Sequence, residues 1–517
     1  MRTTTRRISA LVAAPALFLG LASGLAPAQA DPSPSGTSAA TWLAGELTNG
    51  VMHNPNFGGF DDYGLTIDTA FAELSMGNTS VATQIRTVIA AHVNDYITGE
   101  SFGDTGSTYA GPTAKTLVLA QRTGADPTSF GGVNLVSKLE GLVAASGRIS
   151  DVSTFGDNAN TIGQTFAVEG LTNQNSPKGG AATSYLLTQQ CPAGFFRLDL
   201  GDAQCADNAD PDTDVTAFAV LALQARSSQP AVESALAKAV AWLKSTQAAD
   251  GSFGGGAVTA SPNTNSTGLA AAALGASCQV AAANKAAAYV RSFQVPAGQT
   301  GPLATEVGAV AYDTAAKTAG QTNGITDATS DQWRRATAQA AAGLSWDSSA
   351  KPTVTLEGPA KFVKSGSRVY ATISGAADGE RICLSDGTTT TVVDGIGSPL
   401  TVPIDLPKEG RSVTLTATTG PGAVTATFES LGKDKLKVSL PKTIGQGDRA
   451  AVKLKGFAAK ERVRVLVDGK VVAKGKANGK GTFVGKFVAS FKLGVHQLKA
   501  VGAFKFRKVG ASFRVVP

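Results

Sequence analysis

The sequence has few histidines, cysteines and aromatic residues, and it has no long apolar run after residue 30. Its 517 residues include three His, four Cys and 6% Phe, Trp and Tyr. A membrane-spanning helix needs about 20 consecutive apolar residues, so we expect no membrane anchor after residue 30. Hydrophobic residues make up 43% of the chain and charged residues 16%. This composition is ordinary for globular proteins, and the length favours three or four domains.

The first 30 residues have the pattern of a secretory signal peptide. Three arginines among the first seven residues precede an apolar run over 8–25, and residues 28–30 (Ala-Gln-Ala) offer a small-residue cleavage site. The adjacent Arg6 and Arg7 are a weak signal for twin-arginine export, and general secretion remains the alternative. We therefore expect a secreted, bacterial protein.

Export makes disulfide bonds possible. Cys191 and Cys205 close a short loop between two expected helices, and we predict that they pair. A closed loop of about 15 residues contributes roughly 3 kcal/mol in the chain-entropy model. Cys278 and Cys383 lie in different expected domains, so they either bridge the two domains or are free.

Charge is divided unevenly along the chain. Residues 431–517 hold 21 Lys and Arg but 4 acidic residues, a net charge of +17. Since the whole chain carries +7, residues 1–430 carry −10. An exported protein seldom meets nucleic acid, and the region lacks an organised aromatic platform for stacking bases. We expect it to bind an anionic cell-envelope polymer or lipid headgroups, with strong salt dependence; a solvated lysine-rich surface without a partner is the alternative.

One tract recurs in degenerate copies between about residues 40 and 320. Its clearest copy is Trp242-Leu243-Lys244-Ser245-Thr246-Gln247-Ala248-Ala249-Asp250-Gly251-Ser252-Phe253-Gly254-Gly255. Small apolar segments that predict inner helices lie at 67–74, 162–171, 214–223 and 265–274, with weaker copies near Thr113 and Glu306. Outer helices are expected around Trp42, Tyr96, Leu139, Tyr185, Trp242 and Tyr289. Gln247 is expected to bond loop backbone, because an amide both donates and accepts.

This tract resembles the repeat of the squalene cyclase and protein prenyltransferase superfamily. The resemblance implies an all-α (α/α)6 toroid, in which six inner helices are ringed by six outer ones, for residues 31–347. Period-two alternation then predicts two all-β sandwiches, at 351–430 and 431–517. Both resemble bacterial surface Ig-like modules.

In such a toroid the loops that enter the inner helices meet at one mouth of the central cavity, where we expect ligands to bind. Candidate ligand-binding residues there are polar: Asp61, Asp62, Tyr63, Asp68, Gln164, Asp212, Asp214, Asn265 and Glu306. Together they predict an acidic, amide-rich rim. Asp, Asn and Thr are also common helix N-caps, which accounts for most of these residues but not for a cluster as dense as Asp207, Asp210, Asp212 and Asp214.

The acidic cluster suggests two kinds of chemistry. The stretch Asp212-Thr213-Asp214-Val215 resembles the acidic motif of class II terpene cyclases, which implies that Asp214 is a candidate catalytic acid. The next position is Val215 where that family has Asp, so proton donation is in doubt. Alternating carboxylates at Asp207, Asp210 and Asp212 are weak calcium candidates.

Other chemistry is less well supported by the residues. Zinc chemistry of the prenyltransferase kind needs Asp, Cys and His ligands, and His53, His92 and His496 do not fall in a matching context. A carboxylate pair for sugar cleavage is a further alternative. Of the aromatic residues Phe57, Phe60 and Tyr63, which could stack on a sugar, Phe57 is expected to pack under a neighbouring hairpin.

The sequence therefore predicts a secreted or envelope-associated monomer. Its toroid is expected to bind a small molecule or glycan at the mouth, and its basic tail to tether it to the envelope. The alternative is an enzyme that uses rim carboxylates, either terpene cyclase-like or a polysaccharide lyase or hydrolase.

Overall fold

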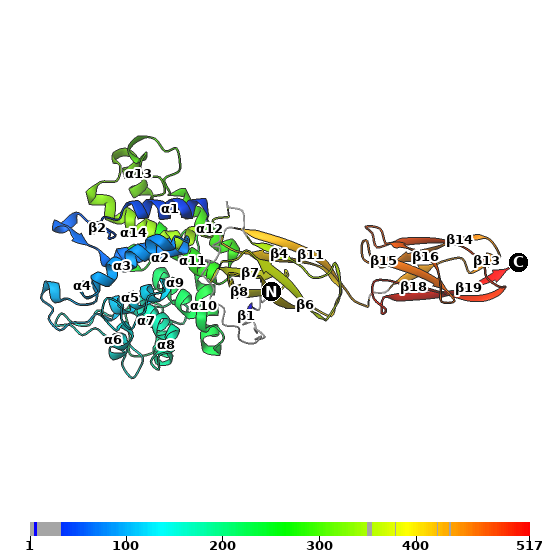
Figure 1. The fold of residues 1–517 in the computed structure, drawn as a ribbon, viewed down its shortest axis with the longest axis horizontal. Helices are drawn as coiled ribbons and strands as arrows, with labels where there is room; N and C mark the ends of the chain where they lie inside the picture. The colour runs from blue at the N-terminus through cyan, green and yellow to red at the C-terminus, as the bar shows by residue number, and fades with distance from the viewer. Residues whose placement is uncertain (1–4, 8–32, 349–353, 378, 421, 434–435) are drawn as a thin grey trace, which may run out of the picture.

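The structure, a computed structural model, describes residues 5–7, 33–348, 354–377, 379–420, 422–433 and 436–517. The molecule is elongated, with a helical domain at one end followed by two β-domains in a row (Figure 1). The expected signal peptide lies outside the described residues, apart from the short strand β1 (Thr5–Arg7). Among the described residues, no helix is long and apolar enough to cross a membrane.

Six helices form a closed ring in the helical domain. Each contacts the next, and α14 returns to contact α2. In ring order they are α2 (Tyr63–Ser75), α5 (Ala110–Arg122), α7 (Thr161–Asn173), α9 (Thr213–Leu223), α11 (Thr264–Ala276) and α14 (Asp327–Leu344). The first five contain the segments expected as inner helices from the sequence.

A second set of helices packs outside this ring. They are α1 (Pro34–Gly45), α3 (Thr79–Ala91), α4 (Val93–Ile97), α6 (Leu135–Gly141), α8 (Gly179–Thr188), α10 (Pro230–Thr246) and α12 (Val280–Ser292). Since an outer segment returns the chain after each inner helix, the inner helices run in the same direction.

The predicted start of the last inner helix near Glu306 is wrong. The chain after α12 first forms the mostly exposed helix α13 (Thr314–Asn323), and the sixth ring helix begins only at Asp327. Glu306 lies before α13, where its Oε2 accepts a hydrogen bond from Trp42 Nε1 of α1 at 2.8 Å. Because α13 is inserted before the sixth inner helix, that helix begins later in the sequence than the spacing of the repeats predicts.

Small residues allow the inner helices to approach closely. A side chain on Gly268 of α11 would place its Cβ 2.4 Å from the Ala340 Cα of α14, closer than any side chain tolerates. Most residues of α11 are fully buried, as expected for a helix covered on every side. The small apolar composition that marked these segments in the sequence is therefore a packing requirement.

The repeated glutamine and glycine link one repeat to the next. Gln247 Nε2 donates to Gly251 O at 3.2 Å and to Ala282 O of α12 at 3.0 Å, as expected from the sequence. Gly251 has a φ of 99°, and a Cβ there would lie 2.4 Å from Lys285 O. At the end of the series, Gln294 Nε2 donates to Ser35 O at 2.8 Å. The last repeat is thereby bonded to the first.

The first β-domain is a sandwich of two sheets around a shared core. One sheet has the order β4 (Thr355–Glu357), β6 (Arg368–Ser374), β9 (Leu400–Asp405). The other has the order β1, β8 (Thr390–Asp394), β7 (Arg381–Ser385), β10 (Arg411–Thr418), β11 (Ala423–Leu431), β5 (Phe362–Lys364). Alternating burial along β10 matches the period-two pattern of the sequence.

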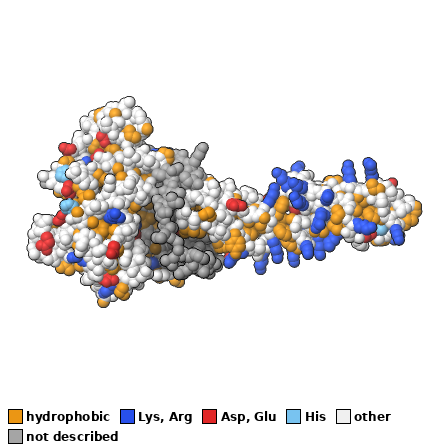
Figure 2. All heavy atoms as spheres, viewed as in Figure 1, with side chains coloured by type: hydrophobic (Ala, Val, Ile, Leu, Met, Phe, Trp, Pro, Cys, Tyr) orange, Lys and Arg blue, Asp and Glu red, His pale blue; other side chains and the backbone are white. Residues whose placement is uncertain are grey.

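The second β-domain is also a two-sheet sandwich with its own core. One sheet has the order β12 (Lys437–Ser439), β14 (Arg449–Lys455), β17 (Phe483–Val488). The other has the order β13 (Thr443–Gly445), β19 (Lys508–Val516), β18 (Gly494–Val501), β15 (Arg462–Val467), β16 (Lys470–Lys476). Lys and Arg side chains are spread over this part of the molecule (Figure 2).

Both cysteine pairs form disulfides. Cys191 and Cys205 are bonded as predicted, and they tie down the loop between α8 and α9. Cys278 and Cys383, which the sequence left open, join the end of α11 to strand β7. Arg381 Nη1 also donates to Ala276 O at 3.0 Å. The first β-domain is therefore fixed to the end of the ring where the inner helices finish, opposite the end where they begin.

Candidate functional site

The inner helices begin at the free end of the ring, and polar side chains cap several of them. Asp62 Oδ1 accepts from Leu65 N at 2.8 Å, and Asp212 Oδ1 accepts from Asp214 N at 2.9 Å. Asn160 and Asn263 cap α7 and α11 in the same way. Among the candidate residues from the sequence, capping therefore accounts for Asp62 and Asp212 but not for most of the others. We call this end of the ring the mouth.

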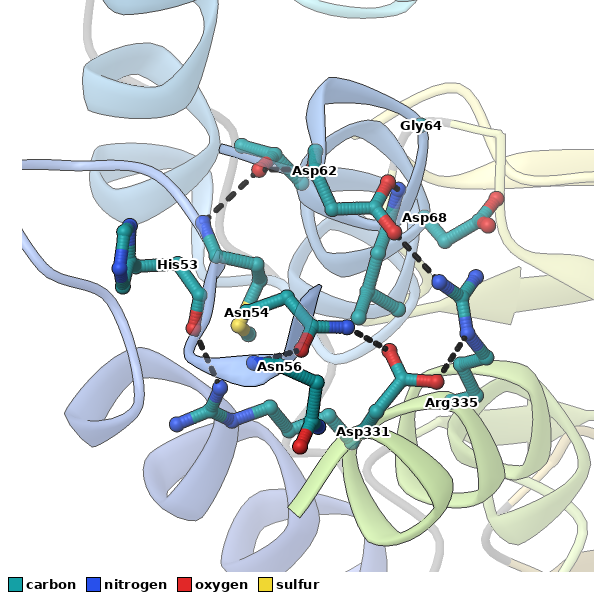
Figure 3. Close-up of polar contacts among 12 residues, drawn as sticks. His53, Asn54, Asn56, Asp62, Gly64, Asp68, Asp331 and Arg335 are labelled. Atoms are coloured by element: carbon teal, nitrogen blue, oxygen red, sulfur yellow. Dashed lines mark hydrogen bonds and ion pairs between the residues drawn. The ribbon is translucent and has the colours of Figure 1, made fainter. Parts of the chain in front are cut away.

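One side of the mouth holds a network of charged and amide side chains from α2, α14 and the 53–62 loop (Figure 3). Arg335 of α14 pairs with the second carboxylate oxygen of Asp62, and its Nε lies 3.0 Å from Asp331 Oδ2. Asn54 Nδ2 donates to the other Asp331 oxygen at 3.1 Å. The expected rim residue Asp62 is therefore neutralised by an arginine and is not a free carboxylate.

A second ion pair lies beside this network. Lys115 Nζ of α5 is 2.7 Å from Asp68 Oδ1 of α2 and donates to Gly64 O at 3.0 Å. Burial alone would lower the pKa of Lys115, but the Asp68 carboxylate and the nearby Tyr96 hold that pKa above its ordinary value. The lysine therefore stays charged, and the predicted acidic rim is a set of neutralised pairs on this side.

A cavity of about 210 Å³ opens between the first turns of α5 and α7. Its lining residues are Tyr96, Gly111, Pro112, Lys115, Asp151, Asn158, Ala159, Asn160, Ile162, Gly163 and Phe166. The cavity thus combines one cationic head group, one carboxylate and two amides with apolar walls, as small-molecule sites commonly do.

Three phenylalanines from the inner helices pack together in the interior of the ring. Phe166 of α7 packs against Phe71 of α2 and Phe218 of α9, with ring centroids 6.0 and 5.7 Å away. Because α2 is not a neighbour of α7 in the ring, the contact with Phe71 crosses the interior. Phe166 also lines the cavity. One wall of the cavity therefore belongs to an aromatic cluster inside the ring.

Asp214 occupies a separate part of the mouth, in the first turn of α9. Burial raises its pKa to about 6, and the Asp212 carboxylate acts in the same direction. The Ser266 hydroxyl at the start of α11 acts in the opposite direction, because it hydrogen bonds the carboxyl and lowers that pKa. Val215 is fully buried in the core. Asp214 is thus a carboxyl that keeps its proton well above the usual acidic range.

The remaining predicted site residues have structural contacts. Gln164 is fully buried, and its amide bonds Ile149 N, Gly147 O and Ala182 O between repeats. Tyr63 stacks on His92, and Asp61 pairs with His53 at 2.9 Å. Asn265 Nδ2 donates to Gln339 Oε1 at 2.9 Å. Gln164 in particular belongs to the repeat linkage and does not face the cavity.

The described residues contain no group of three or more His, Cys, Asp or Glu side chains arranged to hold a metal ion. Of the calcium candidates, Asp212 is committed to capping α9, while Asp207 and Asp210 are exposed. The three side chains are therefore not gathered into a set of oxygen ligands.

Sequence reasoning missed Lys115, Arg335, Asp331 and Tyr96. Lys115 and Arg335 lie within helices whose repeat copies were weak or misplaced, and Tyr96 was expected only to anchor an outer helix. The sequence signal that could have found them is their position in the helix: Lys115 is in the second turn of α5, and Arg335 is in the third turn of α14. Placing them required the helix boundaries.

No family model matches this chain, and no curated protein matches it. Solved structures resemble it over the helical domain. The type II terpene cyclase MstE of Scytonema is 15% identical, with a TM-score of 0.44 over 60% of this chain and 97% of the other. A novel alpha-amylase of Clostridium perfringens is 11% identical, with a TM-score of 0.41 over 60% and 97%.

The unsaturated glucuronyl hydrolase of Bacillus sp. GL1 is 10% identical, with a TM-score of 0.39 over 60% of this chain and 95% of that enzyme. These proteins differ in the reactions that their names describe. At such identities the comparison concerns architecture, and the role of the mouth has to be argued from its own residues.

Proposed function

We propose that this chain is a secreted, envelope-associated protein whose (α/α)6 toroid holds a small ligand at its mouth. The cavity of about 210 Å³ beside Lys115 and Asn160 carries the proposal. It has convergent polar groups and apolar walls, and Phe166 in its wall packs against Phe71 and Phe218; this combination favours retention of a small molecule. Two disulfides support export, because they persist in oxidising compartments.

The test is native mass spectrometry of the protein purified from its own culture medium, which would show a retained ligand as added mass. Ala159→Phe places a ring at the cavity wall and should abolish retention. Val258→Phe is the matched control, because Val258 is 98% exposed and does not line the cavity. Equal ligand mass in both variants, or none in the native protein, would count against the proposed site.

The C-terminal domain is proposed to be an Ig-like module that tethers the protein to an anionic envelope polymer or to lipid headgroups. Like charges face each other directly across its strands in three pairs: Lys437 and Lys455, Arg462 and Lys476, and Arg464 and Lys474. All six side chains are exposed. Such pairs are unfavourable in the free domain, and an anionic polymer would relieve their repulsion.

Binding to isolated cell envelopes tests the tether. The full chain should sediment with the envelope at low salt and be released as salt rises, while a chain that ends at residue 430 should remain in solution. Anionic and neutral lipid vesicles would then distinguish headgroups from wall polymer. Equal retention of both chains would eliminate the tether.

A second function, acid catalysis by Asp214, is favoured by one observation. The carboxyl is buried and its pKa is raised to about 6, so it could donate a proton near neutral pH. The test is turnover of prenyl alkenes, prenyl epoxides and polysaccharides. Activity should be lost in Asp214→Asn and kept in Asp210→Asn, an exposed neighbour. Turnover that survives Asp214→Asn, or no turnover at all, would contradict this role.

A further inference from the structure

Two large aromatic side chains next to the cavity are strongly exposed. Phe102 is 61% exposed and Phe155 is 64% exposed. Both belong to loops that lead into the inner helices α5 and α7. Phe155 lies between Asp151 and Asn158 in the sequence, and both of these residues line the cavity.

The rings are aligned with one another. The planes of Phe102 and Phe155 differ by 12°, with centroids 6.5 Å apart, and those of Phe102 and Tyr109 differ by 9° at 6.4 Å. Direct face-to-face stacking needs shorter separations, and offset stacking fits this range. The three near-parallel rings are therefore staggered, with Phe102 stacked on each of the other two. We call Phe102, Tyr109 and Phe155 the aromatic platform.

A buried carboxylate holds the two loops of the platform together. Asp104 is fully buried, and its Oδ2 accepts from Tyr109 Oη at 2.8 Å and from Ser153 Oγ at 2.6 Å. Its Oδ1 accepts from the backbone N and the hydroxyl of Thr154, at 2.8 and 2.7 Å. These four bonds join the two loops that carry the rings and orient Tyr109, so less ordering entropy remains to be lost on binding.

The cavity beside the platform offers groups that suit hydroxyls. Within the described residues, the side-chain amide of Asn158 makes no hydrogen bond, and Asn160 uses only its Oδ1, to cap α7. Among the described residues that line the cavity, Lys115 is the one cationic side chain and is already paired with Asp68, while Asp151 adds a negative charge. An anionic ligand would find no free cation here, which favours a neutral partner.

We infer that the aromatic platform and the adjoining cavity form a binding site for a neutral oligosaccharide, with sugar rings stacked on Phe102 and Phe155 and a terminal sugar in the cavity. This inference rests on the proposed ligand-binding function of the mouth and specifies the ligand class. The C–H groups on one face of a pyranose pack against aromatic faces, whose electron density is negative. The hydroxyls at the edge of the sugar meet the amides of Asn158 and Asn160.

The experiment titrates the full secreted chain with neutral hexasaccharides of glucose, xylose, mannose and N-acetylglucosamine, by isothermal calorimetry. At least one should bind, and the double variant Phe102→Ala/Phe155→Ala should weaken its affinity by about tenfold or more. Tyr370→Ala is the matched control, since Tyr370 is 57% exposed on the first β-domain and its loss should leave the affinity unchanged.

Conservative variants separate stacking from simple apolar contact. Phe155→Tyr should keep the affinity, whereas Phe155→Leu should lose it although it retains apolar bulk. Equal binding by the Tyr and Leu variants would overturn the inference, and so would the absence of binding by every hexasaccharide. A ligand that is displaced by Ala159→Phe but not by the double Phe variant would refute the platform and leave the proposed function of the mouth intact.

Discussion

Charged side chains are arranged in opposite ways in the helical domain and in the C-terminal β-domain. At the mouth, cationic side chains form ion pairs with carboxylates: Lys115 pairs with Asp68, and Arg335 pairs with Asp62. On the C-terminal sandwich, exposed cations face other cations across the strands, as Lys437 faces Lys455. Paired charges fix a local geometry, whereas unpaired like charges create a field that an external partner can neutralise. The two ends of the molecule are therefore suited to different ligands.

The largest expected change in unfolding free energy comes from an ion pair that is buried in the basic C-terminal domain. Arg507 is 2% exposed and bonds both carboxylate oxygens of the fully buried Glu461, at 2.9 Å each. Glu461→Ala would remove both of these carboxylate bonds from the buried guanidinium, and we expect a loss of about 3–5 kcal/mol in unfolding free energy. Chemical denaturation of the full chain, monitored for the transition of this domain, measures the effect.

Asp448→Ala serves as the control, because Asp448 is an exposed acid in the same domain. It should change the unfolding free energy by less than about 0.5 kcal/mol. Similar losses in the two variants would show that overall charge, and not burial, makes Glu461 important.

In contrast to the ion pairs at its mouth, the helical domain also contains a buried carboxyl that forms no ion pair among the described residues. Glu73 of α2 is fully buried, it forms no ion pair among the described residues, and the side chain of Asn78 offsets its burial only in part. Burial raises its pKa from 4.5 to about 7. Because the unfolded chain ionises first, stability should be complete below pH 4.5, fall as the pH rises towards 7, and stay low above it.

Glu73→Gln removes this pH dependence. At pH 8 it should stabilise the helical domain by about 3 kcal/mol, and near pH 4 it should have almost no effect. Thermal unfolding of both proteins across this pH range provides the measurement. A difference in stability that does not vary with pH would show that Glu73 does not titrate in the folded protein.

At the mouth, breaking one pair should have an intermediate effect. Lys115→Met keeps the length of the side chain but leaves Asp68 without its cation, which should cost about 1–2 kcal/mol because both groups are only partly buried. Arg122→Met is a useful comparison, since Arg122 pairs with Glu169 while its side chain is 41% exposed. It should cost less, about 0–1 kcal/mol. Equal losses would mean that burial at the mouth adds nothing to the Lys115 pair.

Much of the helical domain could be predicted because its repeat serves packing. Gln247, Gly251 and the small residues of 265–274 are required wherever one repeat meets the next, so they recur and identify five inner helices. The sixth was misplaced because α13 interrupts the spacing, and Glu306 was assigned to the rim as a result.

The candidate site was less predictable, because its residues do not recur. Acidic residues at helix starts were found correctly, but Asp62 and Asp212 cap helices there. Their cationic partners come from other helices, and only the folded ring brings Arg335 to Asp62. The exposed rings of Phe102 and Phe155 had no sequence signal either, since burial cannot be told from an isolated Phe beside glycines.

The smallest expected effect tests the unpaired charges themselves. Lys437→Glu places a carboxylate directly opposite Lys455, which replaces a repulsive cross-strand pair by an attractive one. We expect a gain of about 0.2–1 kcal/mol in the unfolding free energy of the C-terminal domain, larger at low salt than at high salt. Lys480→Glu is the control, because Lys480 is exposed and lies outside the strands. If both variants weaken envelope binding but only Lys437→Glu adds stability, the repulsion across the strands is a cost that the basic domain carries for its anionic partner.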